Sequence, residues 1–308
     1  MRHTRLPGLP LRDQWSAHEA RLGRAIAIKL TPHSVAAEVH IHMRLRDKVA
    51  IVVGAGQSPG EGMGNGRATV MRFVQEGAKV LAVDNNLASA EETVAMARQS
   101  GAECVAFAAD VTKEATLAAM VAAARERWGR IDVLHYNVGV SIAGGDAPLE
   151  AITEAAFDRI AAINLRGAIM ACKQVVPVMR AQRSGSIIMI SSVAAWDQYP
   201  NVVYKATKAG MVAFTQQVAI QNAEFGVRAN VILPGLMDTP MAVETRARAS
   251  GKSRAEVAAA RDARVPLRHK MGTAWDVANA ALFLASDEAN FITGVALPVD
   301  GGALVHIN

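Results

Sequence analysis

The sequence predicts a doubly wound α/β protein, in which helices cover both faces of a parallel sheet. Short β-branched runs alternate with alanine-rich stretches from Val49 to the end of the chain. These runs are apolar throughout rather than alternating, which indicates strands that are buried on both faces. The helical stretches between them imply right-handed parallel crossovers.

Seven runs have the length and composition of strands, so we predict a seven-stranded sheet. Ligands of such sheets bind beyond the carboxyl ends of the strands, so polar residues at these ends are the candidates for chemistry. The longest helical stretches are 153–181 and 203–224. The predicted strands are Val49–Val53, Lys79–Val83, Cys104–Ala108, Val133–Tyr136, Ser186–Ile190, Arg228–Ile232 and Ala296–Val299.

Composition excludes several classes of protein. The 308 residues are 51% hydrophobic and 20% charged, enough for a large core. No apolar run approaches the ~20 residues that span a bilayer. The net charge is +5, but no basic stripe interleaves with aromatic residues, so we expect neither a membrane nor a nucleic-acid partner. The two cysteines give no disulfide framework and no metal-ligand spacing, and they fit a reducing cytoplasm.

Residues 1–42 differ from the rest of the chain. They hold five of the eight histidines, six Lys/Arg against three Asp/Glu, and no sustained periodicity. We interpret them as a poorly packed extension, with Met43 as the natural start. No repeat or low-complexity linker interrupts residues 43–308, which we interpret as a single dinucleotide-binding catalytic domain.

A glycine-rich turn follows the first strand and leads into a helix that ends near Gly77. Glycines here let the backbone approach a pyrophosphate at the helix N-terminus, as in Rossmann-like folds. Two registers of the glycine motif are open. The first uses Gly56, Gly60 and Gly62, and the second uses Gly54, Gly64 and Gly66, with Asn65 between the last two. We favour the second because its first glycine ends the strand and its last meets the helix, although it adds six residues to the loop.

Asp84 closes the second strand, eighteen residues after Gly66. A carboxylate at this place binds the adenosine 2′-hydroxyl and repels a 2′-phosphate. Asn85 and Asn86 follow, and neither is the arginine that would accept the phosphate. The sequence therefore predicts NAD rather than NADP.

Polar or small residues also follow the third and fourth strands. Asp110 and Val111 could bond and pack against the adenine, and Asn137 and Gly139 could do likewise. All four lie at the carboxyl ends of successive strands, where a dinucleotide binds.

Tyr204 and Lys208 stand four residues apart in a helical stretch, so they share one face. A nearby ammonium favours the phenolate and moves the tyrosine pKa toward that of a general acid or base. Ser191 and Ser192 follow the preceding strand, and a hydroxyl there could hydrogen-bond the substrate oxygen on which Tyr204 acts.

Taken as a set, these residues resemble the short-chain dehydrogenase/reductase family over nearly all of residues 43–308. Further matching motifs are Tyr136-Asn-Val-Gly139, Asn-Leu-Arg-Gly167, Pro234-Gly235 with Thr239, and Val299-Asp-Gly-Gly302. The resemblance implies an enzyme that interconverts a secondary alcohol and its ketone with NAD. It implies four catalytic residues with distinct roles: Tyr204 as acid/base, Lys208 lowering its pKa and holding the nicotinamide ribose, Ser192 orienting the substrate oxygen, and Asn164 supporting a proton relay through water.

The resemblance also implies that Pro234, Gly235, Met237 and Thr239 meet the nicotinamide carboxamide, and that the protein is a homotetramer built through its two long helices. The sequence departs from the family pattern in three places. The glycine loop has six residues in excess, and Val53 stands before it where the family usually has threonine. Val138 replaces the usual alanine. Ser192 lies twelve residues before Tyr204, where thirteen is usual. The last departure keeps Ser191 open as the acting serine.

Residues 238–269 match the family's substrate lid. They carry six arginines, which we interpret as solvated surface charges, with an acidic substrate as the alternative. We expect an apolar pocket wall from Trp196, Tyr199, Met237 and Met241. Two other functions stay open: an NADPH-dependent 3-oxoacyl-thioester reductase, with which Asp84 conflicts, and a non-catalytic dinucleotide-binding regulatory protein. The six arginines are Arg246, Arg248, Arg254, Arg261, Arg264 and Arg268.

Overall fold

The computed structural model describes residues 43–98 and 103–306. Residues 43–308 form one compact unit. The interpretation of residues 1–42 as an extension lies outside the described residues. Among the residues that are described, no helix is long and apolar enough to cross a membrane.

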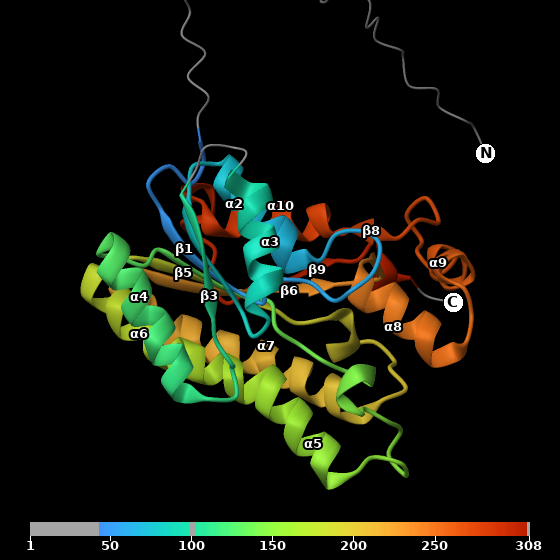
Figure 1. The fold of residues 1–308 in the computed structure, drawn as a ribbon. Helices are drawn as coiled ribbons and strands as arrows, with labels where there is room; N and C mark the ends of the chain where they lie inside the picture. Colours follow the sequence, from blue (N-terminus) through green and yellow to red (C-terminus); the bar gives the residue numbers. More distant parts are fainter. Residues whose placement is uncertain (1–42, 99–102, 307–308) are drawn as a thin grey trace, which may run out of the picture. The chain divides into compact units, whose positions relative to one another are not determined.

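The core of the unit is a parallel sheet of seven strands (Figure 1). Its spatial order is β3-β2-β1-β4-β5-β6-β9, so the order reverses between β1 and β4. Every neighbouring pair is parallel. The strands are β1 (Val49–Val53), β2 (Lys79–Asp84), β3 (Cys104–Ala108), β4 (Val133–Tyr136), β5 (Gly185–Ile190), β6 (Val227–Pro234) and β9 (Ala296–Val299).

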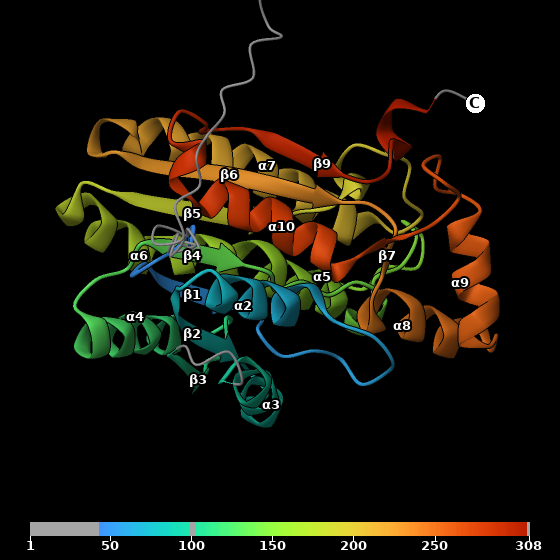
Figure 2. The same cartoon turned by 90° about the horizontal axis from the view of Figure 1, so that it is seen from above.

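Helices cover both faces of the sheet, which confirms the predicted doubly wound architecture (Figures 1 and 2). Ile51 and Val53 of β1 pack in one core with α4, α6 and α7, while Ala50 and Val52 pack in the other with α2, α3 and α10. This alternation is why the strand is apolar at every position. The helices are α2 (Asn65–Gln75), α3 (Leu87–Arg98), α4 (Glu114–Trp128), α5 (Glu154–Ala161), α6 (Gly167–Gln182), α7 (Val202–Asn222) and α10 (Ala274–Ala285).

The structure differs from the sequence prediction in three places. The stretch 153–181 is not one uniform helix, because a π-helical turn at Ala162–Arg166 separates α5 from α6. The lid region contains a helix that we did not predict, α8 (Pro240–Ser250), before α9 (Arg254–Asp262). A second sheet of two short strands, β7 (Met237–Asp238) and β8 (Gly272–Thr273), lies at the base of this region.

One polar side chain is sealed within the core. His135 of β4 is fully buried, and its ring meets the edge of Phe73 with 6.1 Å between ring centroids. Neither ring nitrogen has a hydrogen-bond partner within the described residues. Burial lowers the pKa of this imidazole to about 3, so the ring is neutral at physiological pH.

Candidate active site

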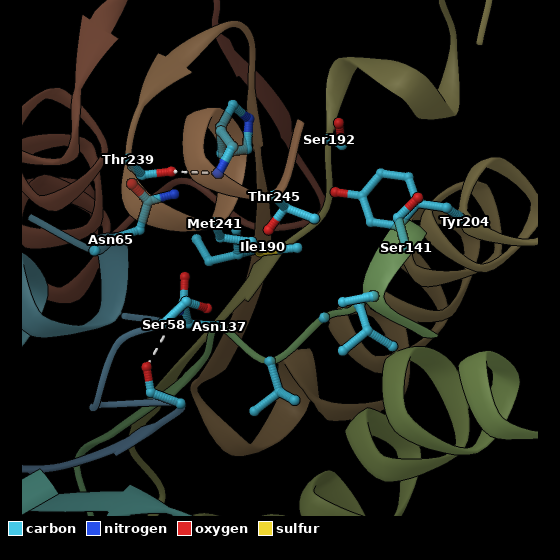
Figure 3. Close-up of a pocket in the computed structure, with 18 of the residues that line it drawn as sticks. Ser58, Asn65, Asn137, Ser141, Ile190, Ser192, Tyr204, Thr239, Met241 and Thr245 are labelled. Carbon is cyan, nitrogen blue, oxygen red and sulfur yellow. Dashed lines mark hydrogen bonds between the residues drawn. The ribbon is translucent and has the colours of Figure 1, made fainter. Parts of the chain in front are cut away.

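A cavity of about 720 Å³ opens at the carboxyl ends of the strands and gathers nearly all the predicted site residues (Figure 3). Gly66 and Asn164 do not line it, because both are buried beside it. The predicted residues that line it are Gly54, Gly64, Asn65, Asp84, Asp110, Val111, Asn137, Gly139, Ser192, Tyr204, Lys208, Pro234, Gly235, Met237 and Thr239.

The glycine-rich turn brings the start of α2 against the end of β1. Gly54 has a φ of +82°, a conformation that glycine adopts without strain. A Cβ on Gly66 would lie 1.8 Å from the carbonyl oxygen of Gly54, so only glycine permits this approach. The side chain of Asn137 donates to the same carbonyl oxygen at 3.2 Å. This geometry favours the register with Gly54, Gly64 and Gly66.

The six additional residues of the turn reach the lid. A Cβ on Gly60 would lie 2.3 Å from Cγ of Glu244 in α8, so loop and helix are in close contact. Arg254 of α9 lies between them: its Nη2 is 2.7 Å from Oδ1 of Asp238, and its Nε is 3.2 Å from Oε1 of Glu244 and 3.8 Å from Oε2 of Glu61. In Figures 1 and 2 this loop, drawn in blue, runs toward α8. We call this set of contacts the loop–lid latch.

Asp84 lines the cavity at the end of β2. Its carboxylate accepts hydrogen bonds from the backbone N–H groups of Gly56, at 2.9 Å, and Asn86, at 3.0 Å. Arg67 belongs to the same region, but its guanidinium donates to Thr93 and forms an ion pair with Glu92 at 2.9 Å.

The lining fits a nicotinamide dinucleotide. The N-terminus of α2 faces the cavity through Gly64 and Asn65, and such termini favour phosphate groups. The side-chain oxygen of Asn65 is buried and has no hydrogen-bond partner among the described residues, so it is available to a ligand. Asp84 offers a carboxylate to a ribose.

The two serines at the end of β5 have different surroundings. Ser191 is buried, and its hydroxyl donates to the carbonyl oxygen of Lys208 at 2.8 Å. Ser192 is only partly buried, and its oxygen accepts from the backbone N–H of Ala194 at 3.1 Å. Figure 3 shows the hydroxyl groups of Ser192 and Tyr204 on one side of the cavity, with Asn65 and Thr239 on the other. The structure therefore pairs Tyr204 with Ser192.

Lys208 lies one turn after Tyr204 on α7, as the spacing predicts. Its Nζ donates to the carbonyl oxygen of Ile190 at 2.7 Å and lies 5.6 Å from the centroid of the Tyr204 ring. A Cβ on Gly139 would come within 2.9 Å of this nitrogen, so glycine leaves room for the ammonium group.

Asn164 is held by the backbone rather than exposed to the cavity. Its Oδ1 accepts from the N–H of Val140 at 2.8 Å, and its Nδ2 donates to the carbonyl oxygen of Val140 at 3.0 Å and to Oγ1 of Thr207 at 3.1 Å. It belongs to the π-helical turn, the widened part of the α5–α6 stretch. Asn164 thus fixes the strand-end segment that carries Gly139.

The pKa values of the central pair differ from the sequence expectation. The pKa of Tyr204 is raised to about 12, mainly because burial disfavours the phenolate; the Ser192 hydroxyl and the charge of Arg246 act in the opposite direction. Burial also lowers the pKa of Lys208 to about 7. In this structure the pKa of Tyr204 therefore lies above its ordinary value, and its lowering by Lys208 stays a prediction.

Two functional candidates escaped the sequence analysis. Asp146 is buried, and its carboxylate accepts from the N–H groups of Val203 and Tyr204, both at 3.1 Å, so it caps α7. Ser141 donates to Asp146 at 3.0 Å and lies 3.1 Å from the hydroxyl of Tyr199. The rings of Tyr199 and Tyr204 are 5.4 Å apart. Asp146 precedes Tyr204 by 58 residues in a loop, so no local pattern links them.

The expected apolar wall is present in part. Tyr199, Met237 and Met241 line the cavity, but Trp196 is 51% exposed and does not. The interpretation of the lid arginines as solvated charges is wrong for Arg261, which is 7% exposed because α9 packs it against β7 and Met271.

A doubly wound sheet with a glycine turn, a strand-end aspartate and a Ser–Tyr–Lys arrangement defines the class of dinucleotide-binding oxidoreductases. A family model described as Enoyl-(Acyl carrier protein) reductase matches residues 60–304. The chain belongs to the short-chain dehydrogenase/reductase family, whose members are oxidoreductases that bind a nicotinamide dinucleotide.

Relatives with different substrates share this similarity. Levodione reductase of Leifsonia aquatica is 35% identical over 84% of this chain and 95% of its own length. The 3-oxoacyl-[acyl-carrier-protein] reductase of Thermotoga maritima is 34% identical over 85% of this chain and 100% of its own. A crystal structure of levodione reductase superposes with a TM-score of 0.80 at 33% identity, covering 86% of this chain and 100% of that one. A short-chain dehydrogenase/reductase structure from Burkholderia xenovorans gives a TM-score of 0.80 at 42% identity, covering 86% and 99%.

Proposed function

We propose that this protein is an NAD-dependent dehydrogenase/reductase that interconverts a secondary alcohol and its ketone, with Tyr204 as general acid/base. The observation that carries the proposal is the convergence of the Ser192 and Tyr204 hydroxyl groups on one wall of the cavity, one turn from Lys208. The nicotinamide, when bound, supplies or accepts a hydride at the carbinol carbon.

The side chains have separate tasks in this proposal. Ser192 and Tyr204 hold the substrate oxygen between them, and Tyr204 moves the proton. Because the raised pKa keeps Tyr204 protonated at neutral pH, it is a proton donor to a ketone. In the other direction the phenolate is the base: Tyr204 first gives its proton to the relay, and the phenolate then accepts the hydroxyl proton of the alcohol and becomes a phenol again. Lys208 holds the nicotinamide ribose, and Asn164 keeps the Val140 backbone in place for a proton relay.

The preference for NAD is supported by Asp84, whose charge would repel a 2′-phosphate. Asn85 and Asn86 line the cavity beside it and offer no cation. Gly54, Gly64, Asn65 and the N-terminus of α2 would hold the pyrophosphate, and the segment from Pro234 to Thr239 would hold the carboxamide.

The test is a screen of secondary alcohols and ketones followed by NADH absorbance, in which NAD and NADP are compared. A Tyr204→Phe variant should bind NADH normally, measured by its fluorescence, and lose roughly 10²- to 10⁴-fold in kcat. Tyr199→Phe is the matched control, since this phenol lines the same cavity but lies against Ser141. Normal turnover by Tyr204→Phe would refute the mechanism.

The two alternatives are separated by the same screen. Turnover of a 3-oxoacyl thioester with NADPH in preference to NADH would establish the thioester reductase. Binding of NADH without turnover of any compound would favour the regulatory protein.

We also propose a cytoplasmic homotetramer. Apolar side chains protrude on the long helices, where Phe157 of α5 is 52% exposed and Ile220 of α7 is 71% exposed. Val305 near the C-terminus is 81% exposed, which suits a second interface. Cys104 and Cys172 are both buried thiols, as a reducing compartment allows. Sedimentation equilibrium would measure the assembly, and a monomer would contradict it.

A further inference from the structure

Three arginines of the lid line the same cavity as Tyr199 and Tyr204. Arg246 comes from α8, Arg261 from α9, and Arg264 from the turn that follows α9. They are graded in exposure: Arg261 is buried, Arg246 is half-buried and Arg264 is exposed. Two elements of the lid therefore direct positive charge to one region.

Two uncharged groups of the protein hold the Arg261 side chain in place. Its Nε contacts the sulfur of Met271 at 3.3 Å, and one Nη donates to the carbonyl oxygen of Met237 at 3.4 Å. Neither partner carries a charge. Since a buried guanidinium is normally paired with an anion, this side chain is incompletely compensated.

We call Arg246, Arg261 and Arg264 the arginine cluster. The carboxylates around this cluster bond other groups. Asp238 is bound by Arg254 at 2.7 Å. Asp197 lines the cavity, and its Oδ1 accepts from the N–H of Gln198 at 2.7 Å. Within residues 43–98 and 103–306, no ion pair joins a carboxylate to Arg246, Arg261 or Arg264. Arg246 bonds only the carbonyl oxygen of Ala242, at 2.8 Å.

The charges of the arginine cluster shift the pKa values of Arg261 and of Tyr204. The charges of Arg246 and Arg264 add to burial in lowering the pKa of Arg261 to about 10. The charge of Arg246 also favours the phenolate of Tyr204. Arg246 is thus the arginine whose charge acts both on Arg261 and on the proton-transfer group.

We propose that the substrate is a carboxylate-bearing secondary alcohol or ketone whose carboxylate is bound by Arg246, Arg261 and Arg264. The proposal rests on the proposed function, since it places the carbinol carbon between Ser192 and Tyr204. A carboxylate offers two acceptor oxygens to the planar donors of a guanidinium, and it supplies the charge that the buried Arg261 lacks. The apolar surfaces of Met241 and Tyr199 contact the chain between the two groups.

The test uses pairs of straight-chain oxo carboxylates of increasing length and their methyl esters, which differ only in charge at the acid end. The wild-type enzyme should prefer the acid. Arg246→Gln and Arg264→Gln should raise the KM of the acid roughly 10- to 100-fold and leave the KM of the ester unchanged. Arg248→Gln is the matched control, since Arg248 lies on α8 but is exposed and outside the cavity lining.

Arg261 needs a second variant because its removal could disturb the packing of α9. Arg261→Lys keeps the charge and should retain more of the preference for the acid than Arg261→Gln, with thermal unfolding recorded for both. Equal turnover of acid and ester by the wild type would overturn the proposal and leave the proposed function standing. Loss of NADH binding in the arginine variants, with acid and ester equally affected, would assign the cluster to the cofactor instead and overturn it too.

If the wild-type protein turns over neither compound, the anion site is judged by binding alone, and the proposed function fails only if no alcohol or ketone of the screen is turned over either. Calorimetric titration of the oxo carboxylates in the presence of NADH should then give heat in the wild type and in Arg248→Gln, and none in Arg246→Gln. No heat in the wild type would overturn the proposal.

Discussion

The carboxylate of Asp146 accepts a hydrogen bond from the backbone N–H of Tyr204 at 3.1 Å, and so fixes the first turn of the helix that presents the phenol to the cavity. The residue before α7, Asn201, provides no side-chain cap of its own. A distant loop thus supplies the negative group that the helix N-terminus requires.

Asp146→Ala should lower both stability and turnover. Loss of the cap costs about 1 to 2 kcal/mol, and the released first turn no longer holds Tyr204 against Ser192. Urea unfolding and kcat measure the two effects. Thr153→Ala is the control, because Thr153 caps α5 by accepting from the N–H of Ala156, and α5 carries no predicted site residue. It should cost stability while kcat is retained; equal loss of kcat in both variants would show that Asp146 acts only through stability.

The two serines should separate by the quantity they change. Ser192→Ala removes the hydroxyl beside Tyr204 and should lower kcat roughly 10²-fold, the scale of losing one hydrogen bond to the reacting oxygen. Ser191→Ala removes the bond to the Lys208 carbonyl and should lower the free energy of unfolding by about 1 kcal/mol, with kcat nearly unchanged. The reverse pattern would transfer the role to Ser191.

Asp84→Asn should weaken the discrimination against NADP. The amide keeps an acceptor for the Gly56 N–H but removes the negative charge, so kcat/KM with NADP should rise roughly 10-fold or more relative to NAD. Asp110→Asn alters the neighbouring strand end and should affect both cofactors alike. A wild-type enzyme that already prefers NADP would contradict the assignment.

His135→Leu should stabilise the protein by about 1 to 3 kcal/mol at neutral pH, since it removes two buried nitrogens without partners. The pH dependence has a definite sign. The pKa of His135 is about 3 in the folded protein and 6.5 ordinarily, so between these values the unfolded chain binds the extra proton. The wild type therefore loses stability as pH falls below 6.5, by up to about 1.4 kcal/mol per pH unit, and the variant lacks this contribution.

Unfolding curves at intervals across the acid range would check this prediction. His306→Leu, at an exposed position, should leave the pH dependence as it is. A difference between wild type and His135→Leu that stays constant with pH would contradict the assigned titration.

The strands and their carboxyl-end residues were predictable because burial on both faces leaves a local imprint. Continuous apolar runs placed β1 and β4, and parallel topology then required Asp84 and Asn137 to lie at one edge. Two lid signals were present but unused: Thr239-Pro240 before α8, and Ser253 with Glu256, which form a capping box at the start of α9.

Other features leave no local imprint. Asp146 caps a helix that begins far along the chain, and the π-helical turn around Asn164 has no distinctive composition. Arg261 resembles its exposed neighbours in sequence, because its burial arises from packing against β7 and Met271.

The loop–lid latch has a consequence for the order of events in turnover. Arg254 joins Asp238 and Glu244 of the lid region to Glu61 of the glycine turn, so the segment over the pyrophosphate and the segment over the substrate are bound to one side chain. We expect dissociation of the dinucleotide to require lid opening, which gives an ordered kinetic scheme in which the cofactor enters first and leaves last. Arg254→Ala should speed NADH release, measured by stopped-flow displacement, and make product inhibition patterns random; the lengthened loop would then be a timing element rather than a tolerated insertion.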